Sequence, residues 1–306
     1  MASVVLITGS STGIGRLTAE TLARAGHIVY ASMREVTAKN AERASELQRL
    51  AADENLRVRV IELDVQNTSS VQAAVDLVIR EQGRIDAVVN NAGLMSIGLA
   101  EGFTEEQVAH QMDVNFMGTV RVSQAVLPFM RTAKTGLLIH VTSIVGRILF
   151  PACAFYCASK FAQEAYAEVL NYELAGTGVE SIVVEPGPYP THLLANSPGP
   201  VGVDRLSGYG QLAGIRGQFI AQFAQLFASA EAPNPQEVGD AILRLVNTPA
   251  GQRAMRTVCG LDFGANKVNE IVAPMQAGVL RALGMEQMVP QIASKHHGKS
   301  AGAPHD

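Results

Sequence analysis

The sequence predicts an α/β fold, a doubly wound parallel sheet of about seven strands with helices on both faces. Short runs of apolar and β-branched residues alternate with longer amphipathic stretches, the order that parallel strands and their connecting helices require. The runs are apolar almost throughout, as in strands that are covered on both faces. With 306 residues, 47% of them hydrophobic, the chain is large enough to bury such a core.

The expected strands are the apolar runs, each closed by a polar residue or a turn residue. In chain order they are Val4–Thr8, His27–Ser32, Arg57–Leu63, Ile85–Asn90, Gly136–Ser143, Val179–Glu185 and the weaker Met255–Gly260. Because all strands of a parallel sheet point the same way, the residues that close them share one edge of the sheet. We therefore expect the functional site at that edge.

Helical spacing marks the stretches between the early strands, namely Ile14–Ala25, Thr37–Ala52 and Ser69–Gln82. Gly26 and Gly83 stand where two of these helices are expected to stop.

After Glu185 the pattern changes to a loop, "PGPYPTHLLANSPGPVG", followed by an apolar region over Phe219–Ala230. A helix is expected over Gln236–Val246, and one more over Asn266–Leu283 with a break near Pro274. We predict one domain over residues 1–290, in which residues 188–232 cover the substrate, and a disordered polar tail over residues 291–306.

Charge and composition exclude several classes of partner. The net charge of −4 gives no reason to expect nucleic acid or an anionic membrane. No segment reaches the roughly 18 consecutive apolar residues of a membrane span. The start "MASVVLITGSS" carries no basic leader and enters a strand directly, so we expect a cytoplasmic protein.

The cysteines Cys153, Cys157 and Cys259 are few and odd in number, which is typical of free thiols in a reducing compartment. Cys153 and Cys157 share a helical spacing, but no set of His and acidic residues accompanies them as a zinc site would require. We therefore expect no metal.

A glycine-rich turn follows the first strand and opens the first helix, "TGSSTGIGR" over Thr8–Arg16. Glycines here permit a tight turn and close approach of the backbone to a ligand. The helix start offers unpaired N–H groups and a positive dipole end to a pyrophosphate. The expected cofactor contacts in this turn are Gly9, Ser11, Thr12, Gly13, Ile14 and Gly15.

Two other kinds of glycine turn are disfavoured here. The segment lacks the Gly-Lys-Ser/Thr ending of a P-loop. Residues 9–13 do match G-x-S-x-G, the nucleophile elbow of serine hydrolases. That elbow normally lies deep in the chain, Gly15 would be unexplained, and His140 and His192 could serve as bases only by special pleading, so a hydrolase is disfavoured.

The end of the second strand indicates which dinucleotide binds. An acidic residue there would hold the adenosine ribose, whereas this chain has Met33 followed by Arg34. Arginine can pair with a 2′-phosphate, which favours NADP(H) over NAD(H), although the adjacent Glu35 weakens the case. Asp64 and Val65, at the end of the third strand, are placed to contact adenine, and a plain turn is the alternative for Asp64.

A tyrosine and a lysine lie four residues apart in "YCASK", Tyr156–Lys160, and so share one helical face. A phenol with a pKa of about 10 is a poor base at neutral pH, and a nearby ammonium is expected to lower that value. Ser143 ends the preceding strand and could hold a carbonyl oxygen. Asn115 lies on an earlier helix, where a buried amide could hold a water that relays protons to Lys160.

In this combination the sequence resembles a classical short-chain dehydrogenase/reductase over roughly residues 4–246. The matching segments are "TGSSTGIG" (Thr8–Gly15), "DV" (Asp64–Val65), "NNAG" (Asn90–Gly93), Asn115, Ser143, "YCASK" (Tyr156–Lys160) and "PG" (Pro186–Gly187) with Thr191. Within the family, "VYASMR" and "FYCASKFAQEAYAE" are similar to the 17β-hydroxysteroid and retinol dehydrogenase branch, a likeness too general to identify a substrate.

The resemblance implies a Rossmann-fold oxidoreductase that interconverts a carbonyl and an alcohol. It makes Tyr156 the general acid/base and Ser143 the holder of the substrate oxygen. Lys160 then tunes the tyrosine and anchors the ribose, and Asn115 supports the relay. Asn91, Ala92 and Gly93 would border the nicotinamide, and Pro186, Gly187 and Thr191 would hold its carboxamide, although the extra prolines of "PGPYPT" stiffen that loop. A homodimer or homotetramer is also implied.

The substrate is expected to be hydrophobic, because residues 188–232 are rich in Leu and Phe, although these side chains could equally be ordinary helical core. Tyr189 and His192 are candidate polar contacts, and Met95, Leu149 and Phe150 are expected to form another wall. A non-catalytic dinucleotide sensor would share the fold but has no need of the Tyr/Lys pair. A scaffolding protein has no need of the glycine turn.

Overall fold

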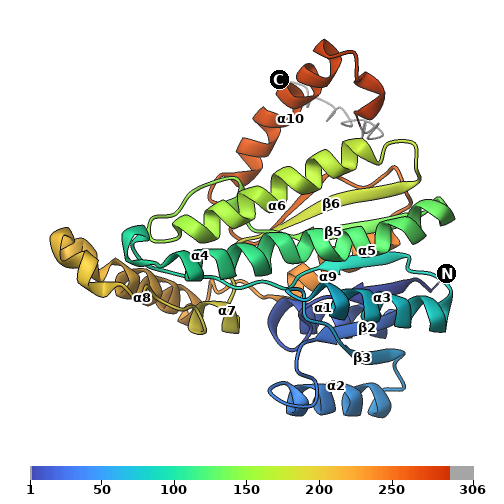
Figure 1. The fold of residues 1–306 in the computed structure, drawn as a ribbon, viewed down its shortest axis with the longest axis horizontal. Coiled ribbons are helices and arrows are strands. Elements are labelled where there is room, and N and C mark those ends of the chain that lie inside the picture. The colour runs from blue at the N-terminus through green and yellow to red at the C-terminus, as the bar shows by residue number, and fades with distance from the viewer. Residues whose placement is uncertain (1, 290–306) are drawn as a thin grey trace, which may run out of the picture.

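The computed structural model describes residues 2–289, and its centre is a seven-stranded parallel sheet in the order β3-β2-β1-β4-β5-β6-β7 (Figure 1). The strands are β1 (Val4–Ile7), β2 (Ile28–Met33), β3 (Val58–Glu62), β4 (Ala87–Asn90), β5 (Gly136–Val141), β6 (Val179–Pro186) and β7 (Arg256–Cys259). All seven predicted strands are confirmed, including the weak last one.

Helices cover both faces of the sheet, as predicted. On one face of the sheet, a core cluster joins strand residues such as Val5 and Ile7 to α1 (Gly13–Arg24), α2 (Ala41–Asp53) and α9 (Gln236–Asn247). The other joins Val4 and Leu6 to α3 (Thr68–Gln82), α5 (Gly118–Ala133) and α6 (Ala154–Glu173). Since alternate residues of each strand enter different clusters, both faces must be apolar, which explains the nearly continuous apolar runs.

The chain winds outward from β1 to β3 and then returns to β4 beside β1. At this change of direction, the loops that follow β1 and β4 diverge and leave a crevice at the carboxyl edge of the sheet. The register brings Ile7 between Ala31 and Val89, so the residues that follow β1, β2 and β4 emerge side by side.

Helix α4 (Glu105–Met112) starts at a capping box made by Thr104 and Gln107 and runs into α5 through a π-helical segment, Asp113–Met117. The extra backbone width of a π segment displaces the residues within it from the regular helical path, a feature often found at functional sites. Asn115 occupies this segment.

The C-terminal part forms two projections. The short α7 (His192–Ala195) leads to α8 (Ile215–Ala228), which extends from one end of the molecule, and α10 (Ala265–Ala282) rises from another side (Figure 1). Short 3-10 turns span Ala100–Gly102, Ile144–Gly146, Val203–Gly214 and Glu286–Met288. No helix among residues 2–289 is long and apolar enough to cross a membrane.

Two predicted helix boundaries are wrong. Helix α2 begins at Ala41 instead of Thr37, because the chain forms a turn first. In this turn Glu35 has a positive φ of 53°, and the Glu35 and Val36 amides donate hydrogen bonds to the two carboxylate oxygens of Glu62. Pro274 lies inside α10 without ending it. The predicted disordered tail falls on residues 291–306, outside the described residues.

Candidate active site

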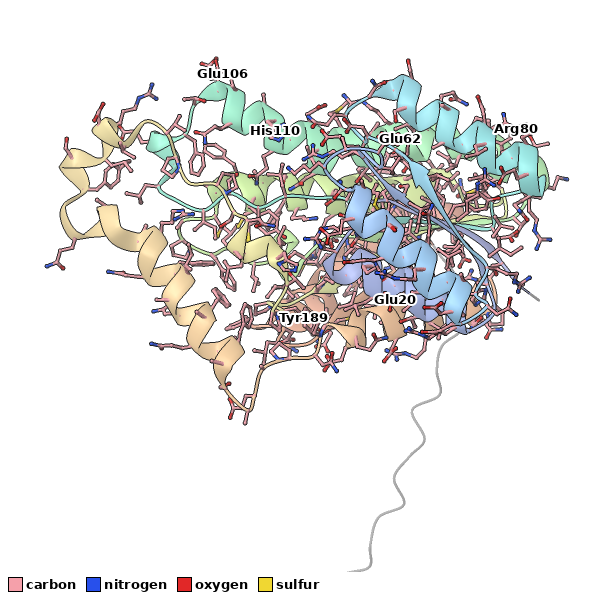
Figure 2. The ribbon with its side chains drawn as sticks, turned by 90° about the horizontal axis from the view of Figure 1, so that it is seen from below. Glu20, Glu62, Arg80, Glu106, His110 and Tyr189 are labelled. Atoms are coloured by element: carbon pink, nitrogen blue, oxygen red, sulfur yellow. The ribbon has the colours of Figure 1, made fainter. Side chains whose placement is uncertain are left out.

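A cavity of about 900 Å³ opens at the carboxyl edge of the sheet. It brings together nearly all of the predicted site residues. They are Gly9, Ser11, Thr12, Gly13, Ile14, Gly15, Arg34, Asp64, Val65, Asn91, Ala92, Gly93, Met95, Ser143, Tyr156, Lys160, Pro186, Gly187, Tyr189, Thr191 and His192. Figure 2 shows the side chains and labels Tyr189 and His110, a lining residue of α4 that the sequence did not indicate.

The glycine turn fits an anionic group. Thr12, the N-cap of α1, is extended and makes no side-chain capping bond to any described residue, and the first turn carries no acidic side chain. The first amides of α1 and the positive end of its dipole are therefore available to a phosphate. Gly13 has a φ of 57°, and a Cβ on it would lie 3.6 Å from Thr191 Cβ, so the loop after β6 closes over the turn.

The loop after β4 holds the glycine turn from behind. The Thr8 hydroxyl accepts hydrogen bonds from the amides of Asn91 and Ala92, both at 3.0 Å. The Asn91 side chain donates to the carbonyl oxygens of Thr8 and Gly9 at 2.9 and 3.1 Å. The side-chain amide of Asn91 therefore stabilises the turn, and Ala92 and Gly93 line the cavity beside it.

Three cationic side chains gather where the adenosine ribose is expected. Arg34 is exposed at the end of β2 and lines the cavity together with Lys39 and Arg43. No ion pair between Arg34 and Glu35 occurs among the described side chains. Lys39 and Arg43 were not predicted. They follow a turn whose Glu35 and Val36 amides donate to Glu62, a partner distant along the chain.

Asp64 is in part a turn residue. Its Oδ1 accepts a hydrogen bond from the Gln66 amide at 3.0 Å, while Asp64 and Val65 both line the cavity. The structure thus shows the turn-forming role for Asp64 alongside a position beside the expected adenine.

Ser143, Tyr156 and Lys160 face the cavity from neighbouring elements. Ser143 lies in the turn after β5, where its hydroxyl donates to the Pro186 carbonyl oxygen at 3.3 Å. Tyr156 and Lys160 lie in the first turns of α6, with exposed fractions of 6% and 4%. The Lys160 ammonium is 5.8 Å from the centre of the Tyr156 ring.

The expected lowering of the Tyr156 pKa is not found. Burial raises the pKa of this phenol well above its ordinary value of 10, and the nearby Ser143 hydroxyl opposes only part of the rise. The Lys160 ammonium donates instead to Val141 O at 3.1 Å and Gln163 Oε1 at 2.9 Å. Desolvation of the phenolate therefore outweighs a cation that is held beside the ring rather than at the hydroxyl.

Burial lowers the pKa of Lys160 to about 8, against the opposing charge of Glu164. The ammonium form therefore predominates at neutral pH, and a modest change in its surroundings changes its charge. This is the range in which a lysine can respond to a neighbouring group.

Asn115 lies behind the cavity, fully buried. Its Oδ1 accepts from the Leu94 amide at 2.8 Å, and its Nδ2 donates to Leu94 O and to Ser159 Oγ, both at 2.9 Å. A Cβ on Gly93 would lie 3.3 Å from Asn115 Oδ1 and 3.8 Å from Lys160 Nζ, so the asparagine and the lysine flank the same glycine. The π-helical segment thus ties the loop after β4 to α6.

An aromatic wall closes the far side of the cavity. Phe219, Phe223 and Phe227 follow one another along α8 at four-residue spacing, and all three line the cavity with Phe150. Ring centres are 4.8 Å apart for Phe219–Phe223 and 6.4 Å apart for both Phe150–Phe219 and Phe150–Phe223. These phenylalanines therefore form one wall of the site as well as packing against each other.

Two predicted substrate contacts need correction. Leu149 is 70% exposed and does not line the cavity, because the turn there directs its neighbour Phe150 inward instead. The Tyr189 hydroxyl donates to Glu237 Oε2 on α9 at 3.1 Å, so Tyr189 offers its ring to the cavity wall while its polar end is engaged elsewhere. Met95 and His192 do line the cavity.

The family model for the short chain dehydrogenases matches residues 3–199. The chain is a short chain dehydrogenase. This membership makes it an oxidoreductase of a family that binds a nicotinamide dinucleotide and interconverts carbonyls and alcohols.

This short chain dehydrogenase has similar curated relatives. It is 41% identical over 194 residues to the 3-ketodihydrosphingosine reductase of Bacteroides thetaiotaomicron, a match that covers 63% of this chain and 66% of that one. It is 37% identical over 253 residues to human 17-beta-hydroxysteroid dehydrogenase type 1, covering 81% of this chain and 75% of that one.

Solved structures share the fold. An alcohol dehydrogenase from Thermococcus sibiricus, complexed with 5-hydroxy-NADP, aligns with a TM-score of 0.68 at 26% identity, covering 85% of this chain and 97% of that one. A short-chain dehydrogenase from Streptomyces avermitilis aligns with a TM-score of 0.72 at 25% identity, covering 93% and 97%.

The hydrolase interpretation of the glycine turn loses one of its two candidate bases. His140 is fully buried on β5, within hydrogen-bond distance of Asn90 and Ser181, and burial lowers its pKa to about 3. It is therefore a structural residue, unavailable to Ser11 as a base.

Proposed function

We propose that this short chain dehydrogenase uses NADP(H) to interconvert a hydrophobic ketone or aldehyde and its alcohol, with Tyr156 as general acid/base. The observation that carries the proposal is the convergence of Ser143, Tyr156 and Lys160 on one cavity with the glycine turn. A sensor would need the turn alone, and a scaffold would need neither.

In the reducing direction, a bound nicotinamide cofactor would supply the hydride that the carbonyl carbon accepts. The Ser143 and Tyr156 hydroxyls hydrogen-bond the carbonyl oxygen and stabilise the negative charge that develops on it. Tyr156 then gives its proton to that oxygen, which completes the alcohol. Lys160 would hold the ribose hydroxyls and, with Asn115 behind it, would support the return of a proton to Tyr156.

The raised pKa of Tyr156 suits this direction. A phenol that keeps its proton at neutral pH is ready to donate it, whereas oxidation of an alcohol would require the phenolate. We therefore propose that Tyr156 is in the protonated form that reduction requires near neutral pH.

The choice of NADP(H) rests on Arg34, Lys39 and Arg43. Their positive charge fits a 2′-phosphate, and no carboxylate occupies the position of the buried Met33 at the end of β2. NAD(H) is the alternative, and Glu62 beside the same turn is the feature that would favour it.

The aromatic wall supports a bulky apolar substrate. The names of two relatives, a 3-ketodihydrosphingosine reductase and a 17-beta-hydroxysteroid dehydrogenase, agree with such a substrate without selecting either one.

The deciding experiment follows NADPH and NADH consumption by the purified protein with a panel of aliphatic, aromatic and polycyclic carbonyls. We expect NADPH to bind, detected by its fluorescence, and to be consumed with apolar carbonyls. Replacing Tyr156→Phe should reduce kcat at least about 1,000-fold and preserve NADPH binding. Binding without turnover over the whole panel would favour a sensor, and substantial residual activity of Y156F would reject the assigned role.

We further propose a homodimer or homotetramer assembled through α5 and α6. Large apolar side chains are exposed there: Met117, in the π-helical segment that leads into α5, and Phe161 and Val169 of α6 have exposed fractions of 39%, 39% and 50%. A monomer in light scattering at micromolar concentration would contradict this assembly.

A further inference from the structure

Four charged side chains form a buried group behind the catalytic edge, here called the carboxylate cluster: Glu164, Glu168, Glu185 and Arg256. Glu164 and Glu185 have exposed fractions of only 2% and 0%. Arg256 Nε lies 3.1 Å from Glu164 and 3.3 Å from Glu185, and its Nη2 lies 2.6 Å from Glu168. One guanidinium thus joins carboxylates from α6 and β6.

The carboxylate cluster and Arg147 together contain one more carboxyl group than guanidinium groups. Burial raises the pKa of Glu164 and Glu185, and the guanidiniums of Arg256 and Arg147 oppose this rise. Three carboxylates against two guanidiniums leave one negative charge when all are ionised. A surplus charge in a buried site is relieved by a proton or by a nearby cation, and Lys160 lies one helical turn before Glu164 on α6.

The same cluster contacts the segments that carry the proposed catalytic groups. The Thr142 hydroxyl donates to Glu164 Oε1 at 2.5 Å, and Thr142 immediately precedes Ser143. Glu185 immediately precedes Pro186 and accepts from Asn269 of α10 at 2.6 Å. A Cβ on Gly146 would lie 2.7 Å from Glu164 Cγ, so the turn after Ser143 packs directly on this side chain.

We propose that Glu164 is a positioning residue for the reaction: its carboxylate keeps the buried Lys160 ammonium charged and, through Thr142, fixes the strand end that carries Ser143. The inference rests on the proposed function. Glu164 acts through Lys160 and Ser143, and it lines neither the cofactor turn nor the cavity.

Lys160 makes no ion pair within 4.0 Å among the described residues, and Glu164, one helical turn away on α6, is the carboxylate that favours its charged form. From β5 it meets the Val141 carbonyl oxygen, and from α6 it meets the neutral Gln163 amide and the Tyr156 phenol, whose raised pKa keeps it neutral. Asn115 approaches across Gly93 from the π-helical segment. Asp113, the carboxylate of that segment, is paired with Arg121. The opposing effects of burial and Glu164 on the Lys160 pKa agree with this arrangement.

The test measures kcat/KM for NADPH-dependent reduction against pH. Wild type should lose activity above about pH 8, as the ammonium deprotonates. In Glu164→Gln this alkaline limb should move about one pH unit lower, because the charge that favours the ammonium is gone. Glu168→Gln is the matched control, since Glu168 lies one turn further on α6 and shares Arg256, and its limb should stay in place.

A second variant separates charge from packing. Thr142→Val keeps the Glu164 charge but removes its hydrogen bond next to Ser143, so kcat should fall while the alkaline limb stays within about 0.3 units of wild type. The inference would be overturned if the alkaline fall in kcat/KM moved equally in E164Q and E168Q. It would also be overturned if this fall moved as far in T142V as in E164Q.

A direct measurement does not depend on activity. In ¹³C-lysine-labelled protein, the Lys160 Cε resonance, assigned by its loss in Lys160→Met, should titrate near pH 8 in wild type and about one unit lower in E164Q. Even if E164Q cannot be purified, the wild-type resonance should show a second inflection as Glu164 titrates, and its absence would reject the inference. An inactive wild type with this coupling intact would reject the proposed function while leaving the Glu164–Lys160 pair in place.

Discussion

Gly15 faces the carbonyl oxygen of Gly9 so closely that a methyl group on Gly15 would overlap both that oxygen and the Asn91 amide. The first turn of α1 and the strand end of β1 are thus in backbone contact, and the loop after β4 locks them there. The shape that admits a phosphate therefore depends on a missing side chain.

Replacing Gly15→Ala should weaken NADPH binding at least about 30-fold. The turn must distort to accept the methyl group, and this distortion costs roughly 2 kcal/mol of binding free energy. Titration of NADPH fluorescence measures the effect. Gly278→Ala on α10 is the control, since a Cβ there meets no described atom within 4 Å, and it should bind like wild type. Unchanged affinity in G15A would show that the cofactor does not use this turn.

Replacing Arg34→Ala should weaken NADPH binding about 10- to 100-fold and leave NADH binding nearly unchanged, because only NADPH carries the 2′-phosphate. Arg80→Ala, an exposed arginine on α3 labelled in Figure 2, is the charge-matched control. Equal losses for both cofactors in R34A would place Arg34 away from the 2′-phosphate and return the choice of cofactor to NAD(H).

Phe150 and Leu149 are adjacent, yet only Phe150 lines the cavity. Phe150→Ala should raise KM for a polycyclic or long-chain ketone about tenfold, with a much smaller effect on a small ketone, because the aromatic wall loses one of its rings. Leu149→Ala should leave both values unchanged. Similar KM effects in the two variants would mean that the turn, and not the ring, determines them.

Much of the fold was predictable because its signals are local. A buried parallel strand needs apolar residues on both faces, and those runs are unmistakable in the sequence. The proposed catalytic residues were also found, since Ser143 follows a strand directly and Tyr156 and Lys160 share a helical face at a fixed spacing.

The features that the sequence did not reveal depend on partners distant along the chain. Lys39 and Arg43 line the cavity after a turn that Glu62 stabilises, and the Tyr189 hydroxyl is engaged because Glu237 lies beside it. The carboxylate cluster joins α6, β6 and β7, so no single segment carries its pattern. The pKa of Tyr156 was predicted in the wrong direction because spacing gives the distance to a cation but not the degree of burial.

Glu185 should make the fold less stable as pH rises. Burial and the charge of Glu164 raise the pKa of Glu185 from 4.5 to about 8, so between these values the folded chain holds a proton that the unfolded chain has lost. The stabilisation that this proton gives is complete below pH 4.5 and disappears as pH rises through about 8, at up to about 1.4 kcal/mol of unfolding free energy per pH unit.

Glu185→Gln carries a permanent neutral group in the same shape and should flatten this slope, so that its unfolding free energy exceeds that of wild type at pH 9. Urea unfolding at pH 5, 7 and 9 measures the difference between the two proteins. A difference that does not grow with pH would show that Glu185 stays ionised beside Arg256 throughout, with the surplus charge of the carboxylate cluster balanced by Lys160 alone.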